Sequence, residues 1–225
     1  MRILFLVLRL AGAVAGIAAI VGQLVTSLGY WAGAGVTDVT VPLVSFFSFF
    51  TIESNVGAVA VFLIGAVVLL LRRDDPAWFS ILRGCVTSYM AVTGIVYNVL
   101  LRGIELPQGA TLPWSNEVLH VVAPVLIVVD WALAPGRRRL EWRHLGWVVG
   151  FPIVWAVYTM IRGPLVYDPV RQRETWYPYP FLDPSLSPEG YVSVACYIVL
   201  IALVIGAVGA AVVWWSRRRA PETAQ

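Results

Sequence analysis

The sequence is poor in charge and contains no lysine. Only 13% of its 225 residues are charged, whereas 59% are apolar. Soluble domains carry about 25% charged residues, so this chain has too few to cover a water-facing surface. All sixteen basic residues are arginines, and the net charge is only +3. The composition predicts a membrane protein and gives no reason to expect a nucleic-acid partner.

Patterns that bind metals or cofactors are also missing. The two histidines, His120 and His144, are predicted to lie on opposite sides of the membrane and so cannot hold a haem between them. The sequence has no cysteine and histidine cluster with zinc-like spacing and no glycine-rich phosphate loop. Cys85 and Cys196 are predicted at different depths, beyond the separation of about 7 Å that a disulfide allows. We therefore expect no metal, no cofactor and no disulfide.

Long apolar runs are the main feature that is present. A membrane-spanning helix needs roughly 20 mainly apolar residues, and six stretches qualify. They predict an all-α fold, a single domain over residues 1–225 formed by one bundle of six transmembrane helices. The predicted spans lie near Leu4–Leu28, Val44–Leu71, Ile81–Leu101, Glu117–Ala134, Leu145–Ile161 and Gly190–Trp215.

The arginines predict the orientation of this bundle. Most of them, including Arg9, Arg83, the run 137–139 and the run 217–219, fall on one side of the predicted spans. The positive-inside rule then places both termini and the tail 216–225 in the cytoplasm of a cell, with the chain in the plasma membrane. A cleaved signal peptide is an alternative interpretation of the first span. Its apolar run exceeds the usual length of about 7–15 residues, so we expect it to be retained.

Titratable groups interrupt one apolar stretch, Ser115–Trp131, which reads SNEVLHVVAPVLIVVDW. Glu117 and His120 are three residues apart and share a helix face, and Pro124 frees a backbone carbonyl near them. Asp130 lies about one turn from the cytoplasmic end, where we expect it to reach the membrane surface or the arginines 137–139.

Polar groups from four predicted helices fall at one level, near the outer face. Ionisable groups inside a bilayer are costly and usually face a cavity or a partner. The simplest alternative is structural: the threonine bonds its own helix, and Glu117 pairs with an arginine at the rim. The gathered residues are Thr51, Asn55, Tyr97, Asn98, Arg102, Asn116, Glu117, His120, Tyr158 and Arg162.

The outer segment 162–189 is rich in proline and aromatic residues. Its prolines prevent a regular helix, and its aromatic rings suit the membrane boundary. The segment is predicted to be an aromatic anchor, a stiff lid over the outer mouth of the bundle, or both. The lid candidates are Trp176, Tyr177, Tyr179, Phe181 and Asp183.

Three motifs, in this order, resemble a known family. They are FFTIESN around Thr51, SNEVLHVVAP around His120, and WYPYPFLD in the outer segment. The chain resembles the androgen-induced and androgen-dependent TFPI-regulating protein family and its bacterial members. The resemblance implies a six-helix membrane fold and hydrolysis of fatty-acid esters, with Thr51 as nucleophile and His120 as general base. After the threonine, this chain is more polar than the animal members.

These observations leave three functional hypotheses. The first is a hydrolase of lipid esters within the membrane, whose partners are membrane lipids and an acyl-ester substrate. In it, Glu117 or a backbone carbonyl fixes the imidazole tautomer. Asn55, Asn98 or a tyrosine hydroxyl stabilises the oxyanion. The second is a lipid-binding membrane scaffold without catalysis, and the third is a transporter of protons or small molecules. The sequence does not identify a protein partner.

Overall fold

The computed structural model describes residues 1–104 and 109–218, and over these residues the predicted all-α fold is confirmed. Apart from one isolated bridge between Asp168 and Arg173, the described residues form no β-structure. Cys85 and Cys196 are both free thiols in the structure.

Within the described residues, six stretches are long and apolar enough to cross a membrane. They begin and end within a few residues of the predicted spans, except for the second. These are Arg2–Gly33, Phe50–Leu70, Ala77–Leu101, Pro113–Leu133, Trp142–Leu165 and Tyr191–Arg218.

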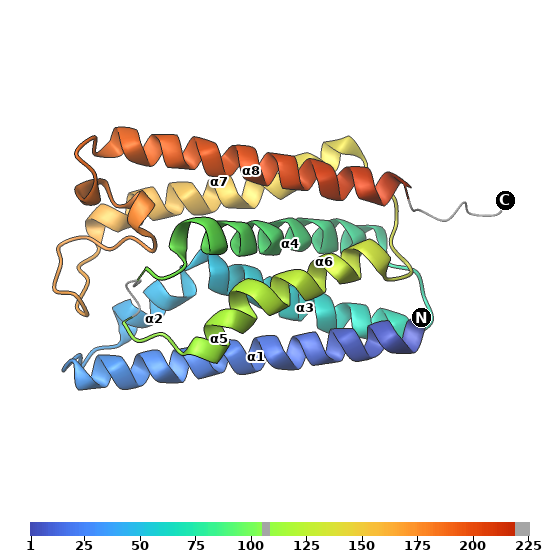
Figure 1. Cartoon of the computed structure of the whole chain (residues 1–225), viewed down its shortest axis with the longest axis horizontal. Helices are drawn as coiled ribbons and strands as arrows, with labels where there is room; N and C mark the ends of the chain where they lie inside the picture. Colours follow the sequence, from blue (N-terminus) through green and yellow to red (C-terminus); the bar gives the residue numbers. More distant parts are fainter. Residues whose placement is uncertain (105–108, 219–225) are drawn as a thin grey trace.

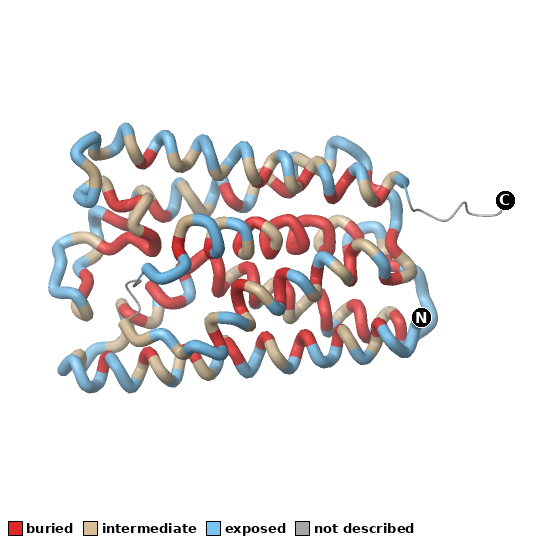
Figure 2. The backbone as a smooth tube through the Cα atoms, in the orientation of Figure 1, coloured by how far each residue is buried: buried red, intermediate tan, exposed pale blue. Residues whose placement is uncertain are grey.

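The helices form a bundle in which α4 (Ala77–Val96) is central. Figure 1 shows α1 (Arg2–Gly33), α3 (Phe50–Leu70) and α6 (Ala123–Leu133) on one side of α4, with α7 (Leu145–Arg162) and α8 (Tyr191–Arg218) on the other. Helix α4 contacts α3, α6, α7 and α8. Figure 2 shows that its residues are mostly buried, whereas the outer faces of α7 and α8 are exposed.

The two ends of the bundle differ in what they hold. Helix α1 begins and α8 ends at the same end, which we call the basal end. At the opposite end, called the distal end, lie the short helix α2 (Thr40–Phe47) and the start of α3. There too lie the start of α5 (Pro113–Glu117) and the loop 163–190, called the distal loop. Helix α6 continues from α5 through one π-helical turn, Val118–Val122, and α4 ends in another, Tyr97–Leu101.

The second predicted span is not one continuous helix, so that prediction was wrong in its first part. Helix α2 ends at Phe47, Ser48 follows, and Phe49 has an extended backbone before α3 begins. The break is stabilised by tertiary contacts: the Trp155 indole donates to the Ser48 carbonyl over 3.0 Å. The Phe49 ring packs edge-on against Trp176 and Tyr179. These partners lie more than 100 residues away in the chain, so local sequence gave no signal of the break.

Asp130 does not reach the membrane surface or the arginines 137–139, and that prediction was also wrong. Its carboxylate is fully buried and accepts from Arg9 Nε over 2.8 Å and from Arg83 Nε over 3.0 Å. Arg83 also donates to Asp75 over 2.6 Å. Two arginines and two aspartates thus neutralise one another inside the basal half, which the sequence had suggested was almost free of charge.

This buried ion-pair network joins α1, α4 and α6. Arg9 further donates to the Gly65 carbonyl of α3 over 2.6 Å. A Cβ at position 65 would lie 2.7 Å from Arg9 Nη1, so only glycine lets the guanidinium reach that carbonyl. Removal of one member of a buried pair leaves a charge without compensation in a low-dielectric environment. The network therefore fixes α1 in the bundle.

Helices α7 and α8 are in close contact near the basal end. A Cβ at Gly209 would lie 2.8 Å from Val148 and 2.9 Å from Leu145, so glycine permits the two backbones to approach there. Toward the distal end, side chains of α7 and α8 line an apolar cavity.

We predict that Asp130→Ala destabilises the protein strongly, because Arg9 and Arg83 would stay buried without a counter-charge. The free energy of unfolding should fall by about 3–5 kcal/mol, measured by titration with sodium dodecyl sulfate in mixed micelles. Glu141→Ala is the control: it removes the Glu141–Arg143 pair, whose side chains are 57% and 75% exposed, and a helix-capping contact at His144, and should cost about 1 kcal/mol or less. Equal effects of the two substitutions would contradict the prediction.

Candidate active site

Thr51 and His120 meet at the distal end of the bundle. Thr51 lies in the first turn of α3, and His120 lies in the π-helical turn before α6. Thr51 Oγ1 is 3.2 Å from His120 Nε2, and both side chains are buried. A hydroxyl within about 3.2 Å of an imidazole nitrogen has the geometry of a nucleophile and its general base. The structure therefore brings together the two residues to which the motifs assigned the chemistry.

The orientation of the His120 ring fixes its tautomer. His120 Nδ1 lies 2.9 Å from the backbone carbonyl of Asn116. Because a carbonyl oxygen only accepts hydrogen bonds, Nδ1 carries the proton and Nε2 keeps a free lone pair toward Thr51. The Tyr97 ring stacks on the imidazole with 3.9 Å between centroids, and the Asn116 amide donates to the Tyr97 hydroxyl. The backbone carbonyl, and not Glu117, orients the imidazole.

Local helix irregularities hold His120 in this position. The π-helical turn widens the helix at Val118–Val122, and such turns are frequent at functional sites. Pro124 has no N–H to donate to the carbonyl of His120 four residues earlier. That carbonyl instead lies 3.4 Å from Asn98 Nδ2, so Asn98 supports the backbone and does not point at Thr51.

Asn55 connects the two helices that carry Thr51 and His120. Its amide donates to the Thr51 carbonyl over 2.9 Å and to the Leu119 carbonyl over 3.1 Å. Both hydrogens of the Asn55 side-chain amide are therefore donated to backbone carbonyls. Asn55 therefore does not supply the oxyanion donor for which it was a candidate, and its role is to hold α3 against the π-helical turn.

Three further candidates lie at the rim. Arg102 and Glu117 form an ion pair of 2.8 Å, with side chains 47% and 49% exposed; this is the rim pairing that the sequence allowed as the simpler alternative. The Tyr158 hydroxyl bonds Ser48 Oγ over 2.9 Å, away from Thr51, so it is not an oxyanion donor in this structure.

The remaining rim candidate, Arg162, lies against the distal loop. Its guanidinium donates to Ser45 Oγ over 3.0 Å and lies 4.8 Å from the centre of the Trp176 ring. It therefore packs α7 against α2 and the loop. No hydrogen bond between Arg162 and Thr51 or His120 is present among the described residues.

The distal loop folds into the mouth of the bundle. Trp176, Tyr177 and Tyr179 are buried and Phe181 is half-buried. Asp183 accepts from the Ser185 backbone over 2.9 Å and shapes the turn that follows. Among the described residues, the aromatic side chains named here point mainly inward, which fits a lid better than a membrane-surface anchor.

The hydroxyl of Tyr179 contacts Thr51 directly. The sequence did not reveal this contact. The hydroxyl oxygen is 3.2 Å from the Thr51 backbone nitrogen and 3.3 Å from Thr51 Oγ1. Burial raises the pKa of Tyr179 to about 12, so the phenol remains protonated at neutral pH. The motif YPFLD had suggested only a place in the lid, because a loop residue 128 positions from Thr51 gives no local indication of such a contact.

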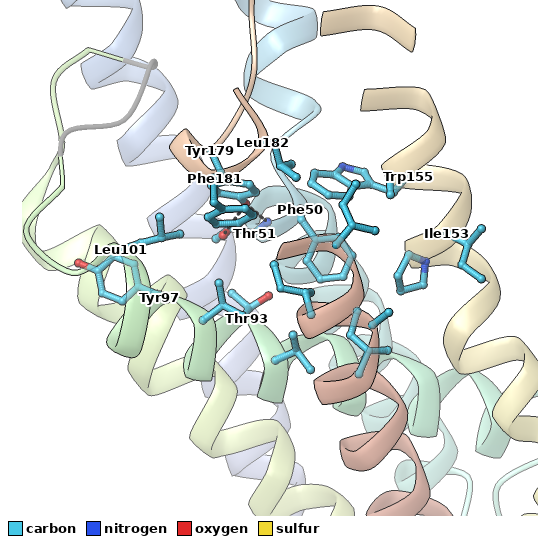
Figure 3. A pocket seen from close by; sticks show the side chains of 18 of the residues that line it. Phe50, Thr51, Thr93, Tyr97, Leu101, Ile153, Trp155, Tyr179, Phe181 and Leu182 are labelled. Carbon is cyan, nitrogen blue, oxygen red and sulfur yellow. Dashed lines mark hydrogen bonds between the residues drawn. The ribbon is translucent and has the colours of Figure 1, made fainter. Parts of the chain in front are cut away.

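An apolar cavity begins at Thr51 and Tyr179. Figure 3 shows the rings of Tyr179 and Phe181 next to Thr51, with Phe50, Thr93 and Trp155 around the space below. The lining side chains from α7 and α8 were not predicted to take part, since they are ordinary apolar residues of a span. They are Val149, Pro152, Ile153, Trp155 and Ala156 from α7, and Ile198, Ile201, Ala202 and Ile205 from α8.

A second, smaller cavity also reaches Thr51. Its lining includes Thr51, His120, Asn116 and Gln23. Thr51 thus lines both an apolar cavity and a smaller one with amide groups. No group of three or more metal-binding side chains occurs within residues 1–104 and 109–218.

Comparison with known proteins yields no match: no family model, no curated protein and no solved structure is significantly similar to this chain.

We predict that Asn55→Ala loosens the site. It removes the amide that bonds two buried carbonyls, so the free energy of unfolding should fall by about 1–3 kcal/mol, measured by titration with sodium dodecyl sulfate. The matched control is Asn98→Ala, which removes an exposed amide at the same end and should cost less than about 1 kcal/mol. A loss for Asn98→Ala as large as for Asn55→Ala would argue against this role of Asn55.

Proposed function

We propose that this protein hydrolyses acyl esters of lipids within the membrane, using Thr51 as nucleophile and His120 as general base. The observation that carries the proposal is the 3.2 Å contact between Thr51 Oγ1 and the unprotonated Nε2 of His120. This contact lies at the head of an apolar cavity. A threonine hydroxyl is a weak nucleophile until a base takes its proton, and a buried imidazole in this tautomer is such a base.

The first half of the reaction forms an acyl-enzyme. Thr51 Oγ1 attacks the ester carbonyl carbon while its proton moves to His120 Nε2. The tetrahedral intermediate then collapses, the bond to the alcohol oxygen breaks, and His120 returns the proton to that leaving oxygen. In the second half, water loses a proton to His120 and attacks the acyl carbon. Thr51 leaves with the proton from His120, and a fatty acid is released.

The two cavities suggest where the parts of the substrate lie. The larger cavity has an almost wholly apolar lining and would accept the acyl chain. Ile153 and Ala202 line this cavity and are also exposed on α7 and α8, so we infer that the chain enters from the side, between these helices. The smaller cavity, with Asn116 and Gln23, would hold the leaving alcohol and then water.

The location proposed for the site follows from the arginines. If both termini lie in the cytoplasm of the cell, as the positive-inside rule predicts, the distal end faces outward and the substrate comes from the outer leaflet of the plasma membrane. The expected family resemblance supports the same reaction. A lipid-binding scaffold remains the second candidate, because the cavity alone accounts for acyl binding without turnover.

We predict that Thr51→Ala and His120→Ala each lower kcat/KM for a long-chain acyl ester by about 10³-fold or more, measured on purified protein in detergent micelles. Thr51→Ser keeps a hydroxyl and should keep measurable activity. A fluorophosphonate should label Thr51 in the wild type, as mapped by mass spectrometry of the labelled peptide.

Matched controls are available for both substitutions. Thr87 is a buried threonine that bonds only its own helix, at the Arg83 carbonyl, and His144 lies at the basal end beside Glu141. Thr87→Ala and His144→Ala should keep near wild-type turnover. Wild-type activity in Thr51→Ala would refute the mechanism, and a wild-type protein that retains acyl esters uncleaved would favour the lipid-binding scaffold.

We further predict that Ala156→Phe discriminates by chain length. The new ring would fill part of the larger cavity, so kcat/KM for a hexadecanoyl ester should fall by about tenfold, a loss of about 1.4 kcal/mol. A butanoyl ester of the same alcohol should change much less. Val157→Phe is the control, since Val157 is the next residue, is 53% exposed and does not line the cavity. Equal losses for both esters would show that the cavity does not hold the acyl chain.

A further inference from the structure

The hydroxyl of Tyr179 has defined donor and acceptor roles. The Thr51 N–H can only donate, so the phenol oxygen accepts across the 3.2 Å contact. The Thr51 hydroxyl hydrogen is directed to His120 Nε2, which is an acceptor in this tautomer. The Tyr179 hydroxyl hydrogen is then left to donate to Thr51 Oγ1 over 3.3 Å. One consistent chain of hydrogen bonds runs from Tyr179 through Thr51 and His120 to the Asn116 carbonyl.

The Thr51 N–H is available because α3 begins immediately before it. The first N–H groups of a helix have no carbonyl partner in the preceding turn. The Ile52 and Glu53 N–H groups both donate to the Phe49 carbonyl, whereas that of Thr51 donates to Tyr179. The break at Ser48 and Phe49 therefore leaves the nucleophile's own amide free to point into the site.

The packing of the Tyr179 ring keeps the hydroxyl in place. The ring stacks on Phe181 with 5.3 Å between centroids and lies edge-on to Phe49 at 5.7 Å. The backbone of Tyr179 is extended and caps the short helix Pro180–Leu182. Burial of a hydroxyl is costly unless it is hydrogen-bonded, so both the ring contacts and the Thr51 contacts hold this orientation.

We propose that the Tyr179 hydroxyl and the Thr51 N–H form the oxyanion hole of the proposed esterase. The inference rests on the proposed function. When Thr51 Oγ1 attacks, the carbonyl π electrons move to the carbonyl oxygen, which becomes an oxyanion one bond from the new tetrahedral carbon. A hydroxyl that already contacts Oγ1 reaches this oxygen by a small rotation, and the N–H turns from the phenol oxygen to the same oxyanion. When the intermediate collapses, the electrons return and both donors are released.

Three other candidates for the oxyanion donor, Asn55, Asn98 and Tyr158, are already engaged among the described residues. The Asn55 amide bonds two backbone carbonyls, Asn98 bonds the Gly94 and His120 carbonyls, and Tyr158 bonds Ser48. The positive end of the α3 dipole adds favourable potential at the proposed oxyanion position. Preorganised donors of this kind act on charge that develops only in the transition state, so they raise kcat more than they lower KM.

The test is Tyr179→Phe, which removes the hydroxyl and keeps the ring. We expect kcat for a long-chain acyl ester to fall by about 10²–10³-fold, with KM changed less than about threefold. A thermal unfolding scan in detergent checks that the variant is folded. Incorporation of 3-fluorotyrosine at position 179 keeps the donor and should restore kcat to within a few-fold of the wild type.

The matched control is Tyr158→Phe, which removes a hydroxyl at the same end that does not contact Thr51, and it should keep wild-type kcat. An unchanged kcat in Tyr179→Phe would overturn the proposal, as would a raised KM with unchanged kcat or a fluorotyrosine protein as inactive as Tyr179→Phe. Failure of the proposed function is a different result, since Thr51→Ala would then be as active as the wild type.

Discussion

The arrangement at the distal end depends on the interruption of one membrane-spanning segment at Ser48 and Phe49. A continuous helix would donate the Thr51 N–H to a carbonyl in the preceding turn and would leave no room for Tyr179. The break costs backbone hydrogen bonds, and in a bilayer the freed groups must find partners within the protein. The Trp155 indole satisfies the Ser48 carbonyl, and the Phe49 ring packs into the distal loop. The same contacts that stabilise the break also bring Tyr179 to Thr51.

The two halves of the bundle use polar groups differently. At the basal end, the carboxylates of Asp75 and Asp130 are neutralised by Arg9 and Arg83 in a closed set of short contacts. At the distal end, Thr51, His120 and Tyr179 line cavities and are joined by bonds of 3.2–3.3 Å. The first arrangement fixes helices relative to one another, whereas the second leaves polar atoms beside open space.

The sequence was sufficient to predict the class of fold, five of the six spans and the gathering of polar groups at one level. The length of the apolar runs determines the spans. The spacing of polar residues along each helix determines which of them share a face. The sequence was insufficient wherever a partner lay far along the chain. Asp130 was assigned to the membrane surface because its two arginines belong to other helices. Tyr179 was assigned to a lid because a loop residue carries no periodicity, and α7 and α8 gave no indication of a cavity because their lining residues are ordinary apolar ones.

If an acyl chain enters between α7 and α8, as proposed, this lateral opening sets the energetics of its binding. Its surroundings are hydrocarbon, so a chain that enters leaves one apolar medium for another and gains little from the hydrophobic effect, which requires transfer from water. Bulk phospholipid tails compete for the same volume at very high local abundance. Discrimination between ligands would then arise at the head of the cavity, where the ester group of the proposed substrate would move from hydrocarbon to hydrogen-bonding side chains. Occupancy would follow the mole fraction of ligand in the bilayer, and not its concentration in the aqueous phase.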